Sequence, residues 1–373
     1  MPTVPDSPLF SPFECRGLRL RNRIAMAPMT RECAPGGVPT PAMAEYYRRR
    51  AAGGTGLVVS EGVAPDESGS FGTAVPRLAG AAAIAGWRAV TDAVHAEGAA
   101  ILAQLWHVGA FSPSMIGMQD SLAADTPRLG PSGLAAPGRP CGRAMTDADI
   151  EATIAAYGAA AAAAREAGFD GVEIHGAHGY LPDQFLWAPT NRRTDRWGGD
   201  LHGRARFGVE VVRECRRRGG EDFAISYRLS QWKQLDYAAR VVDGPHELAA
   251  LLGWLAEAGV DLFHASTRRY WEPAFPGSER CLAAWVRHLS GLPTIAVGSV
   301  TLRTDLKSPG GRQYADTAPE QVADLERRLA DGEFDLVAIG RALLANPDWA
   351  RRVAAGEAAR LQPFSRTYLD ALV

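Results

Sequence analysis

Eight short apolar runs recur along the chain, and each ends close to a glycine, a proline or a polar side chain. Short apolar runs that end at such residues predict buried strands. They lie at 24–26, 57–61, 99–105, 172–175, 223–229, 261–265, 294–297 and 336–339. Stretches that predict helices lie between most of them, at 87–97, 146–167, 245–258 and 319–330. Strands that alternate with helices form parallel sheets, so this is an α/β chain. Eight such units favour a (β/α)8 TIM barrel, with a doubly wound open sheet as the alternative.

The length of 373 residues suits one barrel with insertions. We therefore expect residues 1–373 to form a single domain. A glycine between short mixed runs at 9–23 predicts an N-terminal hairpin that covers one barrel end. Two loops are longer than barrel connections require: an insertion after strand three, at about 110–143, and the segment 266–279 after strand six. A C-terminal tail occupies about 354–373.

Charge and composition exclude several classes of protein. The net charge of −2 offers no positive field for nucleic acid or an anionic membrane. No apolar run approaches the roughly 20 residues of a membrane span, and the first six residues show no leader. The five cysteines are scattered and odd in number, which argues against a disulfide framework and fits a cytoplasmic protein.

The chemically capable residues follow the predicted strands. Because the carboxyl ends of barrel strands share one face, these residues should surround one opening. They are Pro28, Met29, Thr30, Gly62, Gln104, Trp106, His175, His178, Tyr180, Arg228, Gly298, Ser299, Gly340 and Arg341. The turns after strands seven and eight commonly hold a phosphate in this fold, although a glycine there can also be an ordinary turn.

Two histidines three residues apart, His175 and His178, admit three interpretations. They could be structural. They could bind a metal with His107 and a carboxylate such as Glu61 or Glu173, although no usual zinc motif is present. They could also donate two hydrogen bonds to one substrate oxygen, with the Tyr180 phenol as a proton donor.

Arg228, at the end of strand five, has two interpretations. It could pair with an acidic residue of the barrel, or it could stabilise negative charge on an electron-accepting ring. Gln104 and Thr30 could hydrogen-bond such a ring, and without other information each is more simply a satisfied polar group.

Eight motifs occur in one order between residue 9 and about residue 353. They are LFSP (9–12), NRIAMAPMT (22–30), QLWH (104–107), GVEIHGAHGYL (171–181), QFL (184–186), NRRTDRWGG (191–199), RARF (204–207) and IGRALLANPD (339–348). With them the chain resembles the old yellow enzyme family of FMN-dependent ene-reductases.

The resemblance implies a role for each residue at the opening. The FMN ring should be surrounded by Pro28, Met29, Thr30, Gly62, Gln104 and Arg228. The FMN phosphate should be held by Gly298, Ser299, Gly340 and Arg341. His175 and His178 should bind the activating oxygen of the substrate, Tyr180 should be the general acid, and Trp106 should limit how substrates lie.

The activity implied is reduction of the C=C bond of α,β-unsaturated carbonyl or nitro compounds. NADPH or NADH reduces FMN, flavin N5 passes hydride to the β carbon, and Tyr180 protonates the α carbon. The alternatives are the same scaffold used for oxidation, aromatisation or isomerisation, and a metal-dependent hydrolase. The expected partner is a small activated alkene, and the protein could form a homodimer or a larger homo-oligomer.

Overall fold

The computed structural model describes residues 7–123 and 125–372. The first six residues, on which the expectation about a leader rests, lie outside the described residues, as does the last residue of the tail.

Eight parallel strands close into a barrel, so the predicted fold is confirmed and the open-sheet alternative is wrong. In barrel order they are β3 (Ile24–Met26), β4 (Leu57–Val63), β5 (Ala100–Leu105), β10 (Gly171–His178), β11 (Ala224–Lys233), β12 (Leu262–Ser266), β13 (Thr294–Val297) and β15 (Leu336–Ile339). The ladder between β15 and β3 completes the ring and pairs Ala338 with Ala25.

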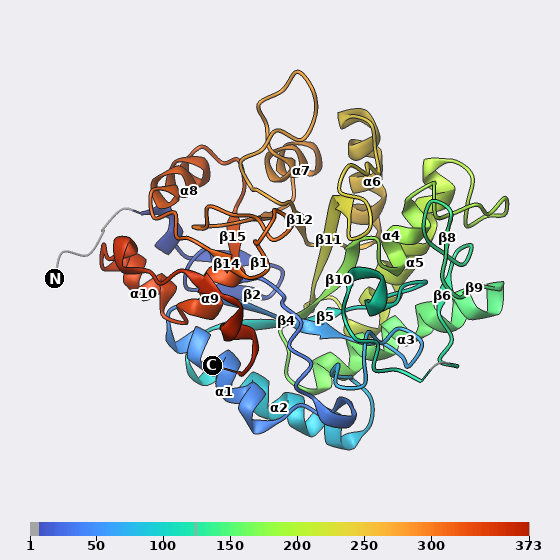
Figure 1. Cartoon of the computed structure of the whole chain (residues 1–373), viewed down its shortest axis with the longest axis horizontal. Helices are drawn as coiled ribbons and strands as arrows, with labels where there is room; N and C mark the ends of the chain where they lie inside the picture. Colours follow the sequence, from blue (N-terminus) through green and yellow to red (C-terminus); the bar gives the residue numbers. More distant parts are fainter. Residues whose placement is uncertain (1–6, 124, 373) are drawn as a thin grey trace.

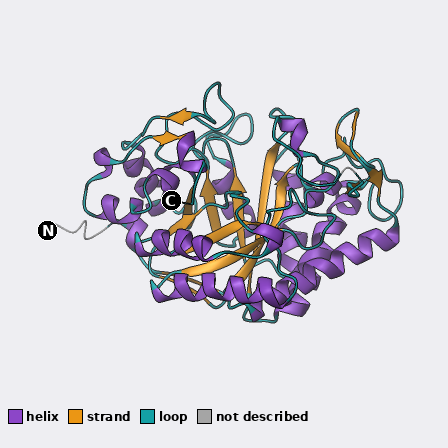
Figure 2. Cartoon of the chain, turned by 60° about the horizontal axis from the view of Figure 1, so that its bottom comes forward, coloured by secondary structure: helices purple, strands orange, loops and turns teal. Residues whose placement is uncertain are grey.

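Helices cover the outside of the barrel (Figures 1 and 2). They are α1 (Pro41–Ala52), α2 (Ala81–Ala96), α3 (Asp147–Glu166), α4 (Leu181–Leu186), α5 (Leu201–Gly219), α6 (Pro245–Ala258), α7 (Leu282–Ser290), α8 (Gln321–Ala330), α9 (Arg341–Ala345) and α10 (Trp349–Ala354). The predicted start of α3 is confirmed by a capping box, in which Thr146 and Asp149 each bond the other's backbone N–H.

The predicted N-terminal hairpin closes the lower end of the barrel. Its strands β1 (Phe13–Cys15) and β2 (Leu18–Leu20) pair antiparallel. Phe13, Leu18 and Leu20 pack in one cluster with inward-facing barrel residues such as Leu57 and Leu102. This end is therefore filled with apolar side chains, which leaves the opposite end for chemistry.

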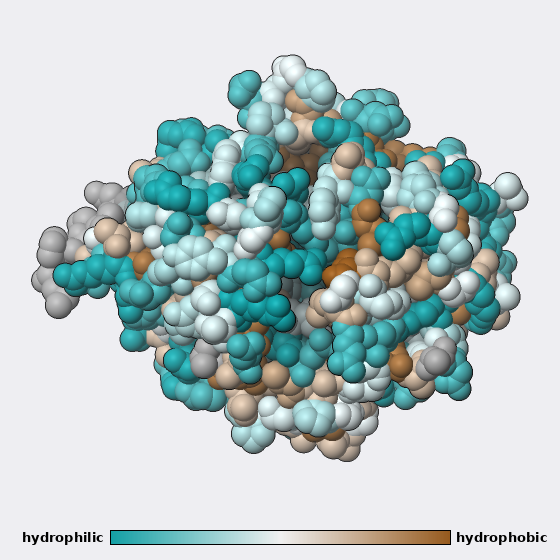
Figure 3. Space-filling view, viewed as in Figure 1, coloured by the Kyte–Doolittle hydropathy of each residue, from teal (hydrophilic) through white to brown (hydrophobic). Residues whose placement is uncertain are grey.

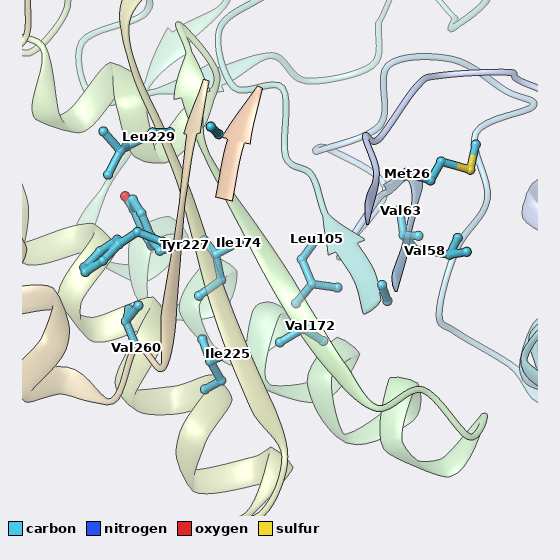
Figure 4. Packing of buried hydrophobic residues seen from close by; sticks show 14 of the residues in the cluster. Met26, Val58, Val63, Leu105, Val172, Ile174, Ile225, Tyr227, Leu229 and Val260 are labelled. Carbon is cyan, nitrogen blue, oxygen red and sulfur yellow. The ribbon is translucent and has the colours of Figure 1, made fainter. Parts of the chain in front are cut away.

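A second apolar layer joins the barrel to its helices. Val172, Ile174, Ile225 and Tyr227 are buried in it, on alternate positions of neighbouring strands (Figure 4). Alternation of this kind sends one set of side chains inward and the other toward the helices. The strand ends are thereby fixed in position.

The insertion after β5 and the C-terminal tail carry small sheets of their own. In the insertion, β6 (Leu129–Gly130) pairs with β9 (Arg143–Ala144), and β7 (Leu134–Ala136) pairs with β8 (Arg139–Pro140). In the tail, β16 (Phe364–Ser365) pairs with β14 (Tyr314–Ala315). The insertion lies on the right of Figure 1, and α9 and α10 lie on the left.

Within the part of the chain that the structure describes, no helix is long and apolar enough to cross a membrane.

Candidate active site

His175, His178 and Tyr180 meet where β10 ends, as the sequence predicts. The two imidazole rings lie 4.9 Å apart between centroids, and the His175 and Tyr180 rings lie 5.0 Å apart, both edge to face. A positive φ of 67° at His178 turns the chain, so that Tyr180 immediately precedes α4. The three side chains are buried and form one corner of the barrel opening.

Both histidines are neutral. Burial, and then the charge of Arg228, lowers the pKa of His175 well below its usual range. Burial, His175 and Arg228 do the same for the pKa of His178. A neutral imidazole keeps one N–H donor. His178 Nε2 lies 2.8 Å from the Ser266 hydroxyl, while His175 Nδ1 is buried with no partner among the described residues.

Tyr180 is protonated at neutral pH. Burial raises the pKa of its phenol above the ordinary value of 10. Its ring is held edge-on by Trp106 at 5.1 Å and by Phe111 at 5.5 Å. A fixed phenol beside two neutral imidazoles can supply a proton to a substrate whose oxygen the imidazoles bind.

Trp106 lies between the catalytic corner and the end of β4. Its ring stacks against Phe71 at 5.0 Å and against His175 at 6.3 Å. A Cβ on Gly62 would lie 2.2 Å from Trp106 Cε3, so only glycine leaves room for the indole. The two predicted residues are thus brought together, and Trp106 walls one side of the corner.

Arg228 lies close to a buried polar network around Glu173. Glu173 accepts hydrogen bonds from Gln104 Nε2 at 2.9 Å and from Ser226 at 3.1 Å, and it lies 2.7 Å from His264 Nδ1. Although burial opposes ionisation, His264 and Arg228 hold the pKa of Glu173 at about 2. Arg228 donates to Ser266, and its Nε has no partner among the described residues.

The turn after β3 carries Pro28, Met29 and Thr30. The first two are half-buried and Thr30 is exposed, directly after a fully buried strand. Glu61 fixes the turn, because its carboxylate accepts the backbone N–H groups of Arg31 and Glu32, both at 3.0 Å. Burial raises the pKa of Glu61 to about 7.

Of the two glycine turns predicted to bind phosphate, the one at Gly340 lies beside this segment, and the one at Gly298 lies beside Thr267 and Arg268. Gly298 has a φ of 146° and Ser299 one of 50°, so the backbone bends sharply after β13. A Cβ on Gly340 would lie 3.7 Å from Met29 Sδ. The Arg341 guanidinium donates to the carbonyl oxygens of Thr304, at 2.7 Å, and Gly311, at 2.6 Å.

These features fit a flavin mononucleotide. The polar edges of a flat ring could be bound by the exposed Thr30 and by the Arg228 Nε, which has no partner among the described residues. The buried Nδ1 of His175, also without a partner there, suits a ligand above the ring. The backbone turns at Gly298 and Gly340 suit its phosphate. The fold and the site together define a flavin-dependent oxidoreductase.

Sequence reasoning missed three supporting residues. His264 was not anticipated, and Asp183 and Lys233 form a buried ion pair at 2.7 Å beneath the turn that bears Tyr180. Asp183 also accepts the backbone N–H of Gly179 at 2.7 Å. In the sequence, these residues stand out only as polar or charged side chains within apolar stretches. That pattern does not reveal which residue each one contacts.

Comparison with known proteins identifies the family. Residues 8–359 match the NADH:flavin oxidoreductase / NADH oxidase family. The chain is 34% identical to 12-oxophytodienoate reductase 7 of Oryza sativa subsp. japonica, over 93% of this chain and 88% of the relative. It is 35% identical to NADH:fumarate oxidoreductase of Klebsiella pneumoniae (strain 342), over 94% of this chain but only 36% of that longer protein.

The fold agrees with these similarities. A structure of morphinone reductase in complex with tetrahydroNAD superimposes with a TM-score of 0.80 and 30% identity, covering 98% of this chain and 94% of that one. The chain belongs to the NADH:flavin oxidoreductase / NADH oxidase family, the old yellow enzyme family. It is therefore an FMN-dependent oxidoreductase that uses NAD(P)H.

The metal interpretation of His175 and His178 gains no support from the geometry. Among residues 7–123 and 125–372, no group of three or more His, Cys, Asp or Glu side chains is placed to hold a metal ion. Glu173, one candidate ligand, is instead engaged by His264 and Gln104.

Proposed function

We propose that the protein reduces the activated C=C bond of α,β-unsaturated carbonyl or nitro compounds with electrons from NAD(P)H. The convergence of two neutral imidazoles and one protonated phenol, with ring centroids 4.9–6.4 Å apart, carries this proposal. Such an arrangement suits a substrate that must be polarised at an oxygen and protonated at a carbon.

FMN, when bound, takes hydride from NAD(P)H and supplies it to the alkene. We assign its ring to Pro28, Met29, Thr30, Gly62, Gln104 and Arg228, and its phosphate to the turns at Gly298–Ser299 and Gly340–Arg341. Arg228 supports negative charge on the ring, and Glu173 balances the arginine when that charge is absent. The same residues come from six of the eight strands, so we regard residues 1–373 as one FMN-binding domain.

His175 and His178 bind the carbonyl or nitro oxygen through their N–H groups. Ser266 holds one nitrogen of His178, which leaves the other for the substrate. Loss of one such donor costs on the order of 3 kcal/mol in the transition state. Tyr180 then donates its proton to the α carbon, and Trp106 restricts how the substrate enters.

We also propose a cellular location and an assembly state for the protein. All five cysteines are free thiols, which supports our proposal of a cytoplasmic location. Assembly into a homodimer or a larger homo-oligomer stays a prediction.

A visible spectrum of the purified protein tests the proposal. We expect flavin bands that bleach on anaerobic addition of NADPH and return on addition of cyclohexenone. Bleaching without return would overturn alkene reduction and favour an oxidation, aromatisation or isomerisation on the same scaffold. A protein that cannot be reconstituted with FMN would overturn the assignment of the ring and phosphate residues.

A further inference from the structure

A cationic cavity opens above the catalytic corner. It has a volume of about 560 Å³ and lies between the insertion, the end of β11 and the connection from β13 to α8. Its lining includes Arg139, Lys307 and Arg312, but no aspartate or glutamate. In the space-filling view, hydrophilic residues gather around the middle of the face shown, with a few hydrophobic residues beside them (Figure 3).

Gln234 joins this cavity to the catalytic residues. It lines the cavity, and its backbone N–H donates to the His178 carbonyl oxygen at 3.0 Å. Its side chain accepts a hydrogen bond from the Lys307 ammonium and also contacts the Tyr180 hydroxyl. Gln234 therefore places the cavity next to Tyr180.

The positive charges in the cavity are not neutralised. Among the described residues, Arg139, Lys307 and Arg312 form no ion pair. Asp305, which accepts the backbone N–H of Lys307, is already bound by Arg268 and Arg269. Lys307 instead lies 4.9 Å from the Tyr237 ring centroid. Burial, with Arg312 and Arg268 nearby, lowers the pKa of Lys307 to about 8. Like charges crowded without a counter-charge favour an anion.

We propose that this cavity binds a carboxylate or phosphate group of the molecule that reacts at His175 and His178. The proposal rests on the proposed function and narrows the substrate to alkenes that carry an acidic group. A guanidinium such as that of Arg312 pairs with a carboxylate or a phosphate through two parallel hydrogen bonds. The phosphate of a nicotinamide dinucleotide has the same chemistry and is the other source of such a group.

Arg312→Gln and Arg139→Gln test the cavity. Arg303→Gln is the matched control, because Arg303 belongs to the same connection but pairs with Glu320 outside the cavity. The substrates are (E)-4-oxopent-2-enoate and its methyl ester, which differ in charge. We expect Arg312→Gln to lower kcat/KM for the acid roughly 10-fold, the value of one charge-assisted hydrogen bond, and to leave the ester within about two-fold.

Two further measurements separate the sources of the anion. Reduction of the flavin by NADPH and by NADH is followed in each variant. A loss confined to NADPH would assign the cavity to its 2′-phosphate, and an equal loss with both would assign it to the pyrophosphate that they share. Binding of 4-hydroxybenzoate and of 4-hydroxybenzaldehyde is titrated from the flavin spectrum, with weaker binding of the benzoate alone expected in Arg312→Gln. The titration needs no alkene turnover, so it stands even if the proposed function fails. Unchanged values for the acid, the benzoate and NADPH in both cavity variants would overturn the proposal.

Discussion

Gly62 shows how one residue sets the shape of the site. Because Gly62 has no side chain, the Trp106 ring can pack directly against its backbone. Trp106 in turn stacks on His175. Gly62→Ala should push the indole aside, because its new Cβ would lie 2.2 Å from Trp106 Cε3. We expect a loss of about 1–3 kcal/mol in the free energy of unfolding, measured with urea, together with weaker FMN retention.

Gly253→Ala is the control for that variant. Gly253 lies in α6 with nothing near an added Cβ, so alanine should be neutral or stabilise the helix by up to about 1 kcal/mol. Equal stability of the two variants would contradict the close contact between Gly62 and Trp106.

Glu61 should make stability depend on pH. Its pKa rises from 4.5 to about 7 in the folded protein, so the folded state binds the proton more tightly than the unfolded state. This stabilisation is full below about pH 4.5 and is lost as the pH rises through 7. Glu61→Gln keeps an oxygen for the N–H groups of Arg31 and Glu32 but removes the titration.

We therefore expect the free energy of unfolding to fall more steeply with rising pH in the wild type than in Glu61→Gln. Between pH 5 and 8 the wild type should lose on the order of 3 kcal/mol relative to the variant. Urea unfolding of both proteins at several pH values measures it. Parallel pH profiles would show that Glu61 does not titrate in this range.

At the scale of elements, Asp305 ties two loops of the catalytic face together. Its fully buried carboxylate pairs with Arg268 and Arg269 from the segment after β12, and it accepts the backbone N–H groups of Lys307 and Ser308. No role for these two arginines was predicted from the sequence. The structure shows that they hold the loop after β12 against the β13–α8 connection.

Asp305→Ala should loosen both loops. We expect a loss of about 1–3 kcal/mol in local stability, because the half-buried arginines regain water while the backbone N–H groups lose their acceptor. Hydrogen exchange at residues 266–279 and 298–318 measures it. Glu320→Ala, which removes only an exposed pair with Arg303, should leave exchange unchanged. Protection retained in Asp305→Ala would contradict the role of the carboxylate.

The sequence predicted strands better than helices, for physical reasons. Each barrel strand is a buried apolar run, which is legible by itself. Helix α1 was not predicted because its buried face is not a regular apolar stripe. That face includes Tyr46, Tyr47 and Arg50, and the Arg50 guanidinium lies 3.8 Å from the Tyr46 ring centroid. Helix α5 contains Gly208, a poor helix former that is needed because a Cβ there would lie 2.9 Å from the Tyr227 hydroxyl.

At the scale of the whole molecule, barrel closure assembles the site. The residues at the ends of strands were predictable, because strand order alone places them on one face. The supporting contacts were not, because they join distant positions. Glu61 holds the backbone of Arg31, Lys233 pairs with Asp183, and His264 pairs with Glu173, a separation of 91 residues. Only the folded chain reveals such pairs.

The C-terminal tail is another whole-molecule feature. The Arg31 guanidinium donates to the carbonyl oxygens of Tyr368, Leu369 and Ala371, at distances of 2.8–3.3 Å. Arg31 directly follows the turn assigned to the flavin ring. The tail is thus docked on its own chain beside that turn.

The central claim is that Tyr180 protonates the substrate after hydride transfer, and Tyr180→Phe tests it most directly. The two half-reactions are measured separately by stopped-flow absorbance, with Tyr270→Phe as a control that removes a hydroxyl bonded to Asp324 outside the site. We predict that reduction of the flavin by NADPH is unchanged in Tyr180→Phe, while its reoxidation by cyclohexenone slows roughly 10²-fold or more. Reoxidation at the wild-type rate would contradict the account and remove Tyr180 from the role of acid.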